Sequence, residues 1–166
     1  MRAIACAAMA AAFTAASPAI AQDEAADPSA EQAVNDMAWH TAQQTYIYDL
    51  KPADGWRLME GGLRWRWTTY NGSQDKPTVN DTVTLHYEGK LIDGTVFDSS
   101  YTRGEPATFP LGRLIKGWQL AVPQMGVGET IEIAIPADLA YGPVGKGPIP
   151  GNATLVFKVE LIEIAK

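Results

Sequence analysis

Cysteine is scarce in this sequence. The 166 residues contain one, Cys6, so the chain can form no internal disulfide and has no cysteine pair to bind zinc. It also lacks the Gly-x-Ser-x-Gly turn of serine hydrolases and the His-Glu-x-x-His motif of zinc proteases. Gly126-Val127-Gly128 is no dinucleotide fingerprint, because it follows a predicted helix and precedes a strand, the reverse of the required order. We therefore expect no nucleophilic or hydride-transfer enzyme, no metal site and no cofactor.

Positive charge and long apolar runs are scarce as well. Lys and Arg total 13 against 19 Asp and Glu, which gives a net charge of −6. A nucleic-acid partner requires a basic face, so we do not expect one. No stretch approaches the roughly 20 apolar residues that a membrane-spanning helix needs, and we expect no membrane span.

The N-terminus has the features of a secretion signal. A basic start precedes an apolar, acid-free run over 3–16, and Ala19 and Ala21 place small residues where signal peptidase reads them. We expect residues 1–21 to be a signal peptide, and the mature protein to be exported to a bacterial periplasm. The apolar stretch before Cys6 is too short for a lipoprotein signal.

Residues 22–52 are predicted to form an acidic tether and a short helix. QDEAADP at 22–28 has little to bury and suits a solvated segment. Over 29–44, Ser29 and Gln32 have the spacing of a capping box, and three apolar residues fall on one stripe. A helix of about four turns is marginal alone in water. It either packs on the domain or pairs with another copy.

Apolar and polar residues alternate through the second half of the chain, which predicts strands with one buried and one solvated face. Four segments share this pattern: 63–67, 83–87, 131–135 and 155–161. Asn71-Gly72, after the first, is a turn signal. Within this second half, only 115–122 has helical spacing. The sequence thus predicts an α+β fold over 53–166, in which one short helix covers a curved antiparallel sheet.

A loop rich in glycine and proline precedes the last predicted strand. AYGPVGKGPIPGN, residues 140–152, has four glycines and three prolines, which neither a helix nor a central strand accommodates. Long irregular loops in compact domains are usually either disordered or functional. We expect this one to be a flap over a binding pocket.

Aromatic residues gather near the predicted loops. Any one of them is most simply a core residue, but seven with an adjacent acid favour an apolar pocket that carries a few polar groups. They are Tyr87, Phe97, Tyr101, Phe109, Trp118, Tyr141 and Phe157, with Asp98 directly after Phe97.

Three blocks of the sequence resemble the FKBP-type peptidyl-prolyl isomerases. They are HYEGKLIDGTVFDSS at 86–100, LIKGW at 114–118, and LAYG at 139–142 followed by IPGNATLVFKVELI at 149–162. The resemblance covers about residues 61–166. It implies a five- or six-stranded antiparallel sheet wrapped around one short helix, in agreement with the periodicity.

The resemblance also implies a substrate pocket. Trp118 would form its floor, Ile115 would offer a backbone N–H, and Arg103 would flank it. The catalytic groups would be Asp98, Tyr141 and Tyr87, with Asp98 hydrogen-bonded to Tyr87. The implied substrate-binding residues are Tyr87, Phe97, Asp98, Phe109, Leu114, Ile115, Trp118, Tyr141, Ile149 and Phe157.

The implied function is rotation of X–Pro bonds during the folding of exported proteins. The partners would be proline-containing polypeptides and the macrolide inhibitors of the family. The alternative is a non-catalytic peptide-binding module or holdase that uses the same pocket. Four tryptophans outside the pocket could add an apolar surface to it, although ordinary strand packing explains the last two at least as well: Trp39, Trp56, Trp65 and Trp67. The 29–44 helix is too short to resemble the dimerising stalk of exported relatives. Clients, oligomeric state and the role of this helix stay open.

Overall fold

Two long antiparallel strands, β3 and β7, form the centre of the fold. They pair from Thr82 opposite Ala165 to Leu91 opposite Leu155, in a computed structural model that describes residues 28–165. The expected signal peptide lies outside the described residues. All strand pairs are antiparallel, in the order β1-β2-β6-β7-β3-β4, and β5 also pairs with β3. The strands are β1 Arg57–Leu58, β2 Arg64–Thr69, β3 Thr82–Leu91, β4 Val96–Ser99, β5 Ala107–Pro110, β6 Thr130–Ile135 and β7 Leu155–Ala165.

The predicted α+β fold is confirmed, although the described residues form seven strands instead of five or six. β1, β4 and β5 have two to four residues each, which is too short for a period-two pattern to emerge from the sequence. β3 matches its prediction, because every second residue along it is buried. β6 and the first residues of β7 are buried on both faces, so the solvated face predicted for them is absent there. Burying each large apolar side chain of this kind stabilises the fold by about 1.5–3 kcal/mol.

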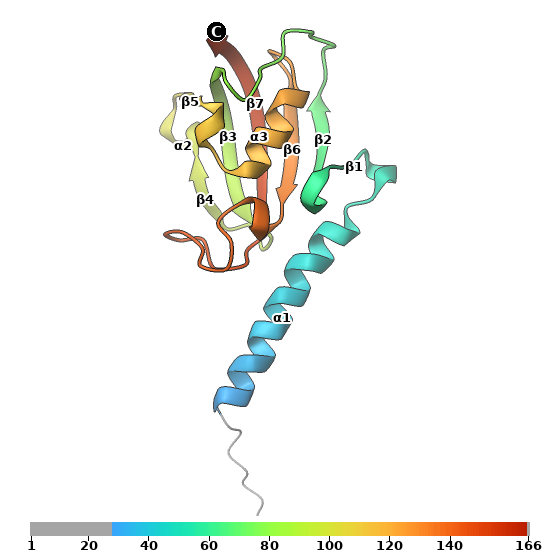
Figure 1. Cartoon of the computed structure of the whole chain (residues 1–166), viewed down its shortest axis with the longest axis vertical. Helices are drawn as coiled ribbons and strands as arrows, with labels where there is room; N and C mark the ends of the chain where they lie inside the picture. The colour runs from blue at the N-terminus through green and yellow to red at the C-terminus, as the bar shows by residue number, and fades with distance from the viewer. Residues whose placement is uncertain (1–27, 166) are drawn as a thin grey trace, which may run out of the picture.

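One short helix, α3 (Lys116–Ala121), lies across the concave face of the sheet (Figure 1). Gly117 allows the close approach, since a Cβ atom there would come within 2.4 Å of the Ile135 side chain on β6. The other helices are α1 Pro28–Asp49 and the single turn α2 Ser100–Arg103. Short 3-10 turns occupy Pro52–Asp54, Glu60–Gly62, Leu111–Arg113, Val122–Gln124 and Ala137–Leu139.

The N-terminal helix is longer than predicted. α1 has 22 residues and continues to Asp49, five residues beyond the predicted end. Its C-terminal half packs on the domain, where Trp39 contacts the core and Gln43 is buried. Its N-terminal half extends away from the sheet (Figure 1), and Met37 is exposed. No helix within residues 28–165 combines the length and apolar character needed to cross a membrane.

The turn signal Asn71-Gly72 lies just after β2, where Gly72 has positive φ and the Ser73 N–H donates to Asn71 Oδ1. β2 pairs with β6 and not with β3, and the buried carboxylate of Glu129 binds the start of the loop that follows β2. Its oxygens accept hydrogen bonds from the backbone N–H groups of Asn71, Gly72 and Gly126 and from the Trp67 indole. Burial alone would raise the pKa of Glu129, but these donors outweigh it and hold the pKa below its ordinary value.

Candidate active site

A cavity of about 430 Å³ lies between the sheet, α3 and the loop that precedes β7. Its volume is in the usual range for small-molecule and peptide-side-chain pockets. Ten lining residues are those expected to bind substrate: Tyr87, Phe97, Asp98, Phe109, Leu114, Ile115, Trp118, Tyr141, Ile149 and Phe157. Lys146, Gly147 and Pro148 also line it. These three were not singled out from the sequence, although the expected flap contained them.

Aromatic rings line the cavity, and the Trp118 ring among them is buried. The Trp118 ring meets Tyr87 and Phe157 edge to face, at centroid distances of 5.4 and 5.2 Å. Phe157 in turn meets Phe97 edge to face at 5.6 Å. Such edge-to-face contacts restrain each ring beyond the effect of area burial. The cavity therefore has a fixed apolar lining.

Gly89 on β3 makes room for two of these rings. It lies opposite Phe157 of β7 and opposite Asp98 of β4, so that Phe97 and Phe157 flank it. A Cβ atom at Gly89 would come within 2.6 Å of both phenyl rings. A side chain here would push the rings into the cavity.

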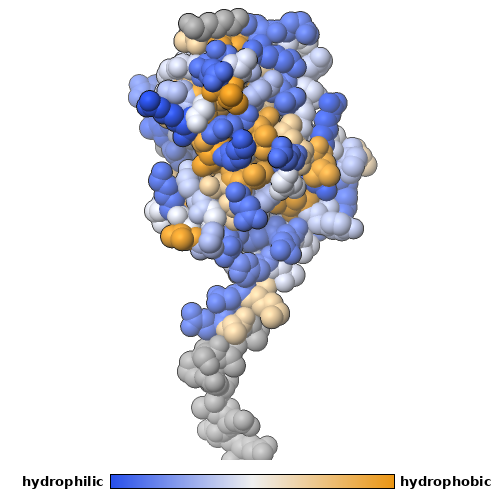
Figure 2. Space-filling model, in the orientation of Figure 1, coloured by the Kyte–Doolittle hydropathy of each residue, from blue (hydrophilic) through white to orange (hydrophobic). Residues whose placement is uncertain are grey.

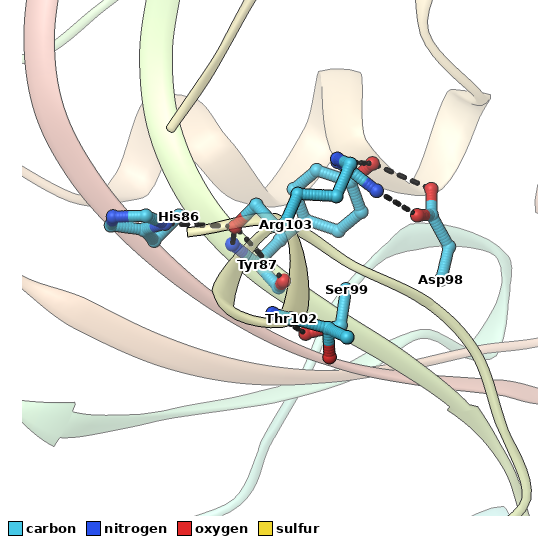
Figure 3. Close-up of polar contacts among 7 residues, drawn as sticks. His86, Tyr87, Asp98, Ser99, Thr102 and Arg103 are labelled. Carbon is cyan, nitrogen blue, oxygen red and sulfur yellow. Dashed lines mark hydrogen bonds and ion pairs between the residues drawn. The ribbon is translucent and has the colours of Figure 1, made fainter. Parts of the chain in front are cut away.

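Asp98, Tyr87 and Arg103 form a closed triangle of hydrogen bonds at the cavity wall (Figure 3). The Tyr87 hydroxyl donates to Asp98 Oδ2 at 2.5 Å, and Arg103 Nη1 donates to Asp98 Oδ1. Arg103 Nη2 donates to the Tyr87 oxygen at 2.9 Å. The expected hydrogen bond between Asp98 and Tyr87 is therefore present, and Arg103 also contacts both of its partners.

This triangle fixes the charge states of the cavity. Burial alone would raise the pKa of Asp98, but the hydrogen bonds from Tyr87 and Arg103 and the charge of Arg103 lower it overall. Burial and the neighbouring Asp98 raise the pKa of Tyr87, and the same two causes raise that of Tyr141. At neutral pH the site thus contains one ionised carboxylate and two protonated phenols.

Ser100, the first residue of α2, is hydrogen-bonded to β3 next to the triangle. The Ser100 hydroxyl accepts a hydrogen bond from the Tyr87 backbone N–H at 2.8 Å, and His86 Nδ1 lies 2.9 Å from the same oxygen. Ser100 is fully buried, so this Ser–His pair cannot serve as a nucleophile. Within residues 28–165, no three His, Cys, Asp or Glu side chains are placed to hold a metal ion.

The loop over 140–152 contains no helix or regular strand, as predicted. Gly142, Gly145 and Gly147 have positive φ, which other residues rarely adopt. Near its tip Lys146 and Ile149 exchange backbone hydrogen bonds of 2.9 and 3.0 Å, and Ile149 faces the cavity. This loop, called the flap below, is therefore a shaped wall of the cavity.

The four tryptophans do not form an exposed apolar surface, and Trp65 is packed into the core as its strand position allowed. Trp56 and Trp65 are buried, and Trp39 and Trp67 are only partly accessible. Arginine side chains cover two of these rings. The guanidinium carbon of Arg57 lies 4.5 Å from the centroid of the Trp67 ring, and that of Arg66 lies 4.7 Å from the centroid of the Trp56 ring. Figure 2 instead shows apolar residues gathered over the middle of the face that carries α3, with hydrophilic residues around them.

The sequence comparisons assign the family. Residues 73–162, more than half of the chain, match the family described as FKBP-type peptidyl-prolyl cis-trans isomerase. The chain belongs to this family. The FKBP region accounts for every lining residue of the cavity and for the whole flap.

Relatives of known name agree with the assignment to the FKBP family. The chain is 50% identical to the peptidyl-prolyl cis-trans isomerase Mip of Coxiella burnetii over 117 residues, 70% of this chain and 50% of Mip. It is 49% identical to the FKBP-type isomerase FkpA of Aeromonas hydrophila over 123 residues, 74% of this chain and 46% of FkpA. The chain therefore spans about half the length of these relatives.

The FKBP fold is found among solved structures as well. The crystal structure of FkpA from Escherichia coli superposes with a TM-score of 0.75 at 36% identity, over 82% of this chain and 63% of that one. The predicted resemblance to the FKBP-type isomerases is therefore confirmed in both sequence and fold.

Proposed function

We propose that this protein is a peptidyl-prolyl cis-trans isomerase that accelerates rotation about X–Pro bonds while proteins fold. The observation that carries the proposal is the apolar cavity lined by Trp118, with the Asp98–Tyr87–Arg103 triangle on its wall. The isomerase names of relatives near 50% identity support it. We assign this activity to residues 53–166.

The cavity suits this reaction because the reaction needs no nucleophile. Amide resonance imposes a barrier of roughly 18–20 kcal/mol, and unaided rotation takes tens to hundreds of seconds. The twisted amide is less dipolar than the planar one. An aromatic pocket that removes water from the carbonyl therefore favours the twisted state. A million-fold acceleration would require the cavity to bind the twisted amide about 8 kcal/mol more strongly than the planar amide.

Each polar group then has a role in the proposal. Trp118 supports the proline ring, and the backbone N–H of Ile115 donates to a substrate carbonyl. Tyr141 stays protonated because its pKa is raised, so its hydroxyl donates to the rotating carbonyl. Asp98 holds Tyr87 in place through its hydrogen bond. Donors that meet the carbonyl only after rotation lower the barrier, because they stabilise the twisted state selectively.

Proline-limited refolding separates this function from the alternative of a binding module or holdase. Catalytic amounts of the protein are expected to accelerate the slow phase, and Asp98→Val or Tyr141→Phe is expected to abolish most of the effect. An unchanged rate, with aggregation suppressed only at stoichiometric amounts, would favour the holdase.

We also propose that the protein is exported to the periplasm after loss of residues 1–21, and that macrolide inhibitors of the family occupy the same cavity. The basic, apolar and small-residue segments of the N-terminus support export. N-terminal sequencing of the protein from a periplasmic fraction is expected to begin at Gln22. An intact Met1 in that fraction would contradict cleavage.

A further inference from the structure

α1 is hydrogen-bonded to the segment that connects the flap to β7. The Trp39 indole N–H donates to the Gly151 carbonyl at 3.2 Å. The Thr154 backbone N–H donates to Gln43 Oε1 at 2.9 Å, and the Thr154 hydroxyl donates to the Gln43 carbonyl at 3.3 Å. These contacts join residues more than 100 positions apart in the chain.

The contacts made by Gln43 are shielded from water. Gln43 is 4% exposed and Thr154 is 2% exposed. Removing the Gln43 oxygen would leave the Thr154 N–H buried without its acceptor, which costs more than the loss of an exposed hydrogen bond. Trp39 adds an apolar contact, because its ring packs against the domain core. The position of residues 151–154 thus depends on α1.

The flap depends on this segment in turn. The Asn152 N–H donates to the Gly142 carbonyl at 2.9 Å and closes the base of the loop. Ile149, two residues before Gly151, lines the cavity. Between Gly142 and Gly151 most residues are exposed and only Ile149 is buried against the core, so the two ends of the loop supply much of the restraint on its position. A shift of residues 151–154 would therefore move a wall of the cavity.

We propose that α1 positions the flap, with Gln43 and Trp39 as the positioning residues. The inference rests on the proposed isomerase function, because it assigns to α1 an effect on substrate affinity. Neither residue contacts the cavity. They act through Thr154 and Gly151, which hold the base of the flap and thereby set how far the Ile149 side chain projects into the cavity.

Two variants test the proposal in the full chain. Gln43→Met keeps the length of the side chain and removes the acceptor of Thr154, whereas Trp39→Phe removes the indole donor and keeps a ring. Thr45→Ala, at an exposed position of α1, is the matched control. Hydrogen exchange of the Lys146, Ile149 and Asn152 amides reports the flap. Steady-state kinetics with a Leu–Pro peptide reports the cavity.

We expect exchange of the three flap amides to accelerate about three- to ten-fold in Gln43→Met and Trp39→Phe, with the KM raised by a similar factor and kcat within two-fold. The control should match the wild type. Flap exchange and KM within two-fold of wild type in both variants would overturn the inference, whatever the melting temperature does. Faster flap exchange in a protein that lacks isomerase activity from the start would instead refute the proposed function and retain the positioning role.

Discussion

Asp98→Asn removes the negative charge from the cavity wall with little change in shape. The carboxylate accepts hydrogen bonds from both Tyr87 and Arg103, whereas an asparagine offers one oxygen and turns an NH₂ group toward one of these donors. One donor therefore loses its partner. Hydrogen bonds to a charged group contribute about 1.5–3 kcal/mol when buried, and exposed ion pairs contribute roughly 0–1 kcal/mol.

The Asp98 and Arg103 side chains are 44% and 43% exposed. We therefore expect the loss of one hydrogen bond to Asp98 to cost about 1–2 kcal/mol, between the buried and the exposed range. If the triangle holds Tyr87 for the twisted amide, kcat/KM falls about 5- to 30-fold. The measurement is the relaxation of a Leu–Pro peptide from cis to trans, monitored with increasing enzyme.

Glu132→Gln is the matched control. Glu132 forms the ion pair of 2.6 Å with Arg66, also half-buried, on strands that do not line the cavity. It should lose comparable stability and keep its kcat/KM. Wild-type kcat/KM in Asp98→Asn, or an equal loss in Glu132→Gln, would refute a specific role for the triangle.

Three further predictions concern packing and pH. Gly89→Ala should lower the free energy of unfolding by about 1–3 kcal/mol, because its Cβ would overlap the Phe97 and Phe157 rings; an unchanged urea midpoint would contradict this. The Asp98 pKa is lowered and those of Tyr87 and Tyr141 are raised, so these groups should cause no change in kcat/KM between about pH 5.5 and 9. The lowered pKa of Glu129 means that its carboxylate stabilises the fold above its unfolded pKa of about 4.3, and that this stability is lost as the pH falls through the folded pKa. Acid unfolding of Glu129→Gln should lack that pH dependence and start from a lower stability; identical acid titrations would exclude the role.

The sequence was informative where one face of a strand is buried along its length. Alternation identified β3, β6 and β7, and Tyr87 and Phe157 lie on their inward faces. β4 and β5 were not predicted, since four residues carry too little periodicity. The ten cavity residues came from the family resemblance and not from spacing alone, because side chains from six separate segments meet only in the folded chain.

The parts that were missed depend on tertiary contacts. Asn71-Gly72 has a local turn signal, but that signal does not report the distant carboxylate of Glu129 that binds both backbone N–H groups. The predicted end of α1 came five residues too early. The contact between Gln43 and Thr154 anchors the helix close to the predicted end, and the helix continues beyond it. No local pattern reports a partner 111 residues away.

The most direct test of the central claim is exchange spectroscopy by nuclear magnetic resonance on a Leu–Pro peptide, with the protein at about one-hundredth of the peptide concentration. With the wild-type protein, exchange cross-peaks are predicted between the cis and trans signals of the proline, because the two forms interconvert within seconds. With Trp118→Ala these cross-peaks should be absent. Peptide signals that broaden on binding while cis–trans exchange stays at its unaided rate would contradict catalysis in this cavity.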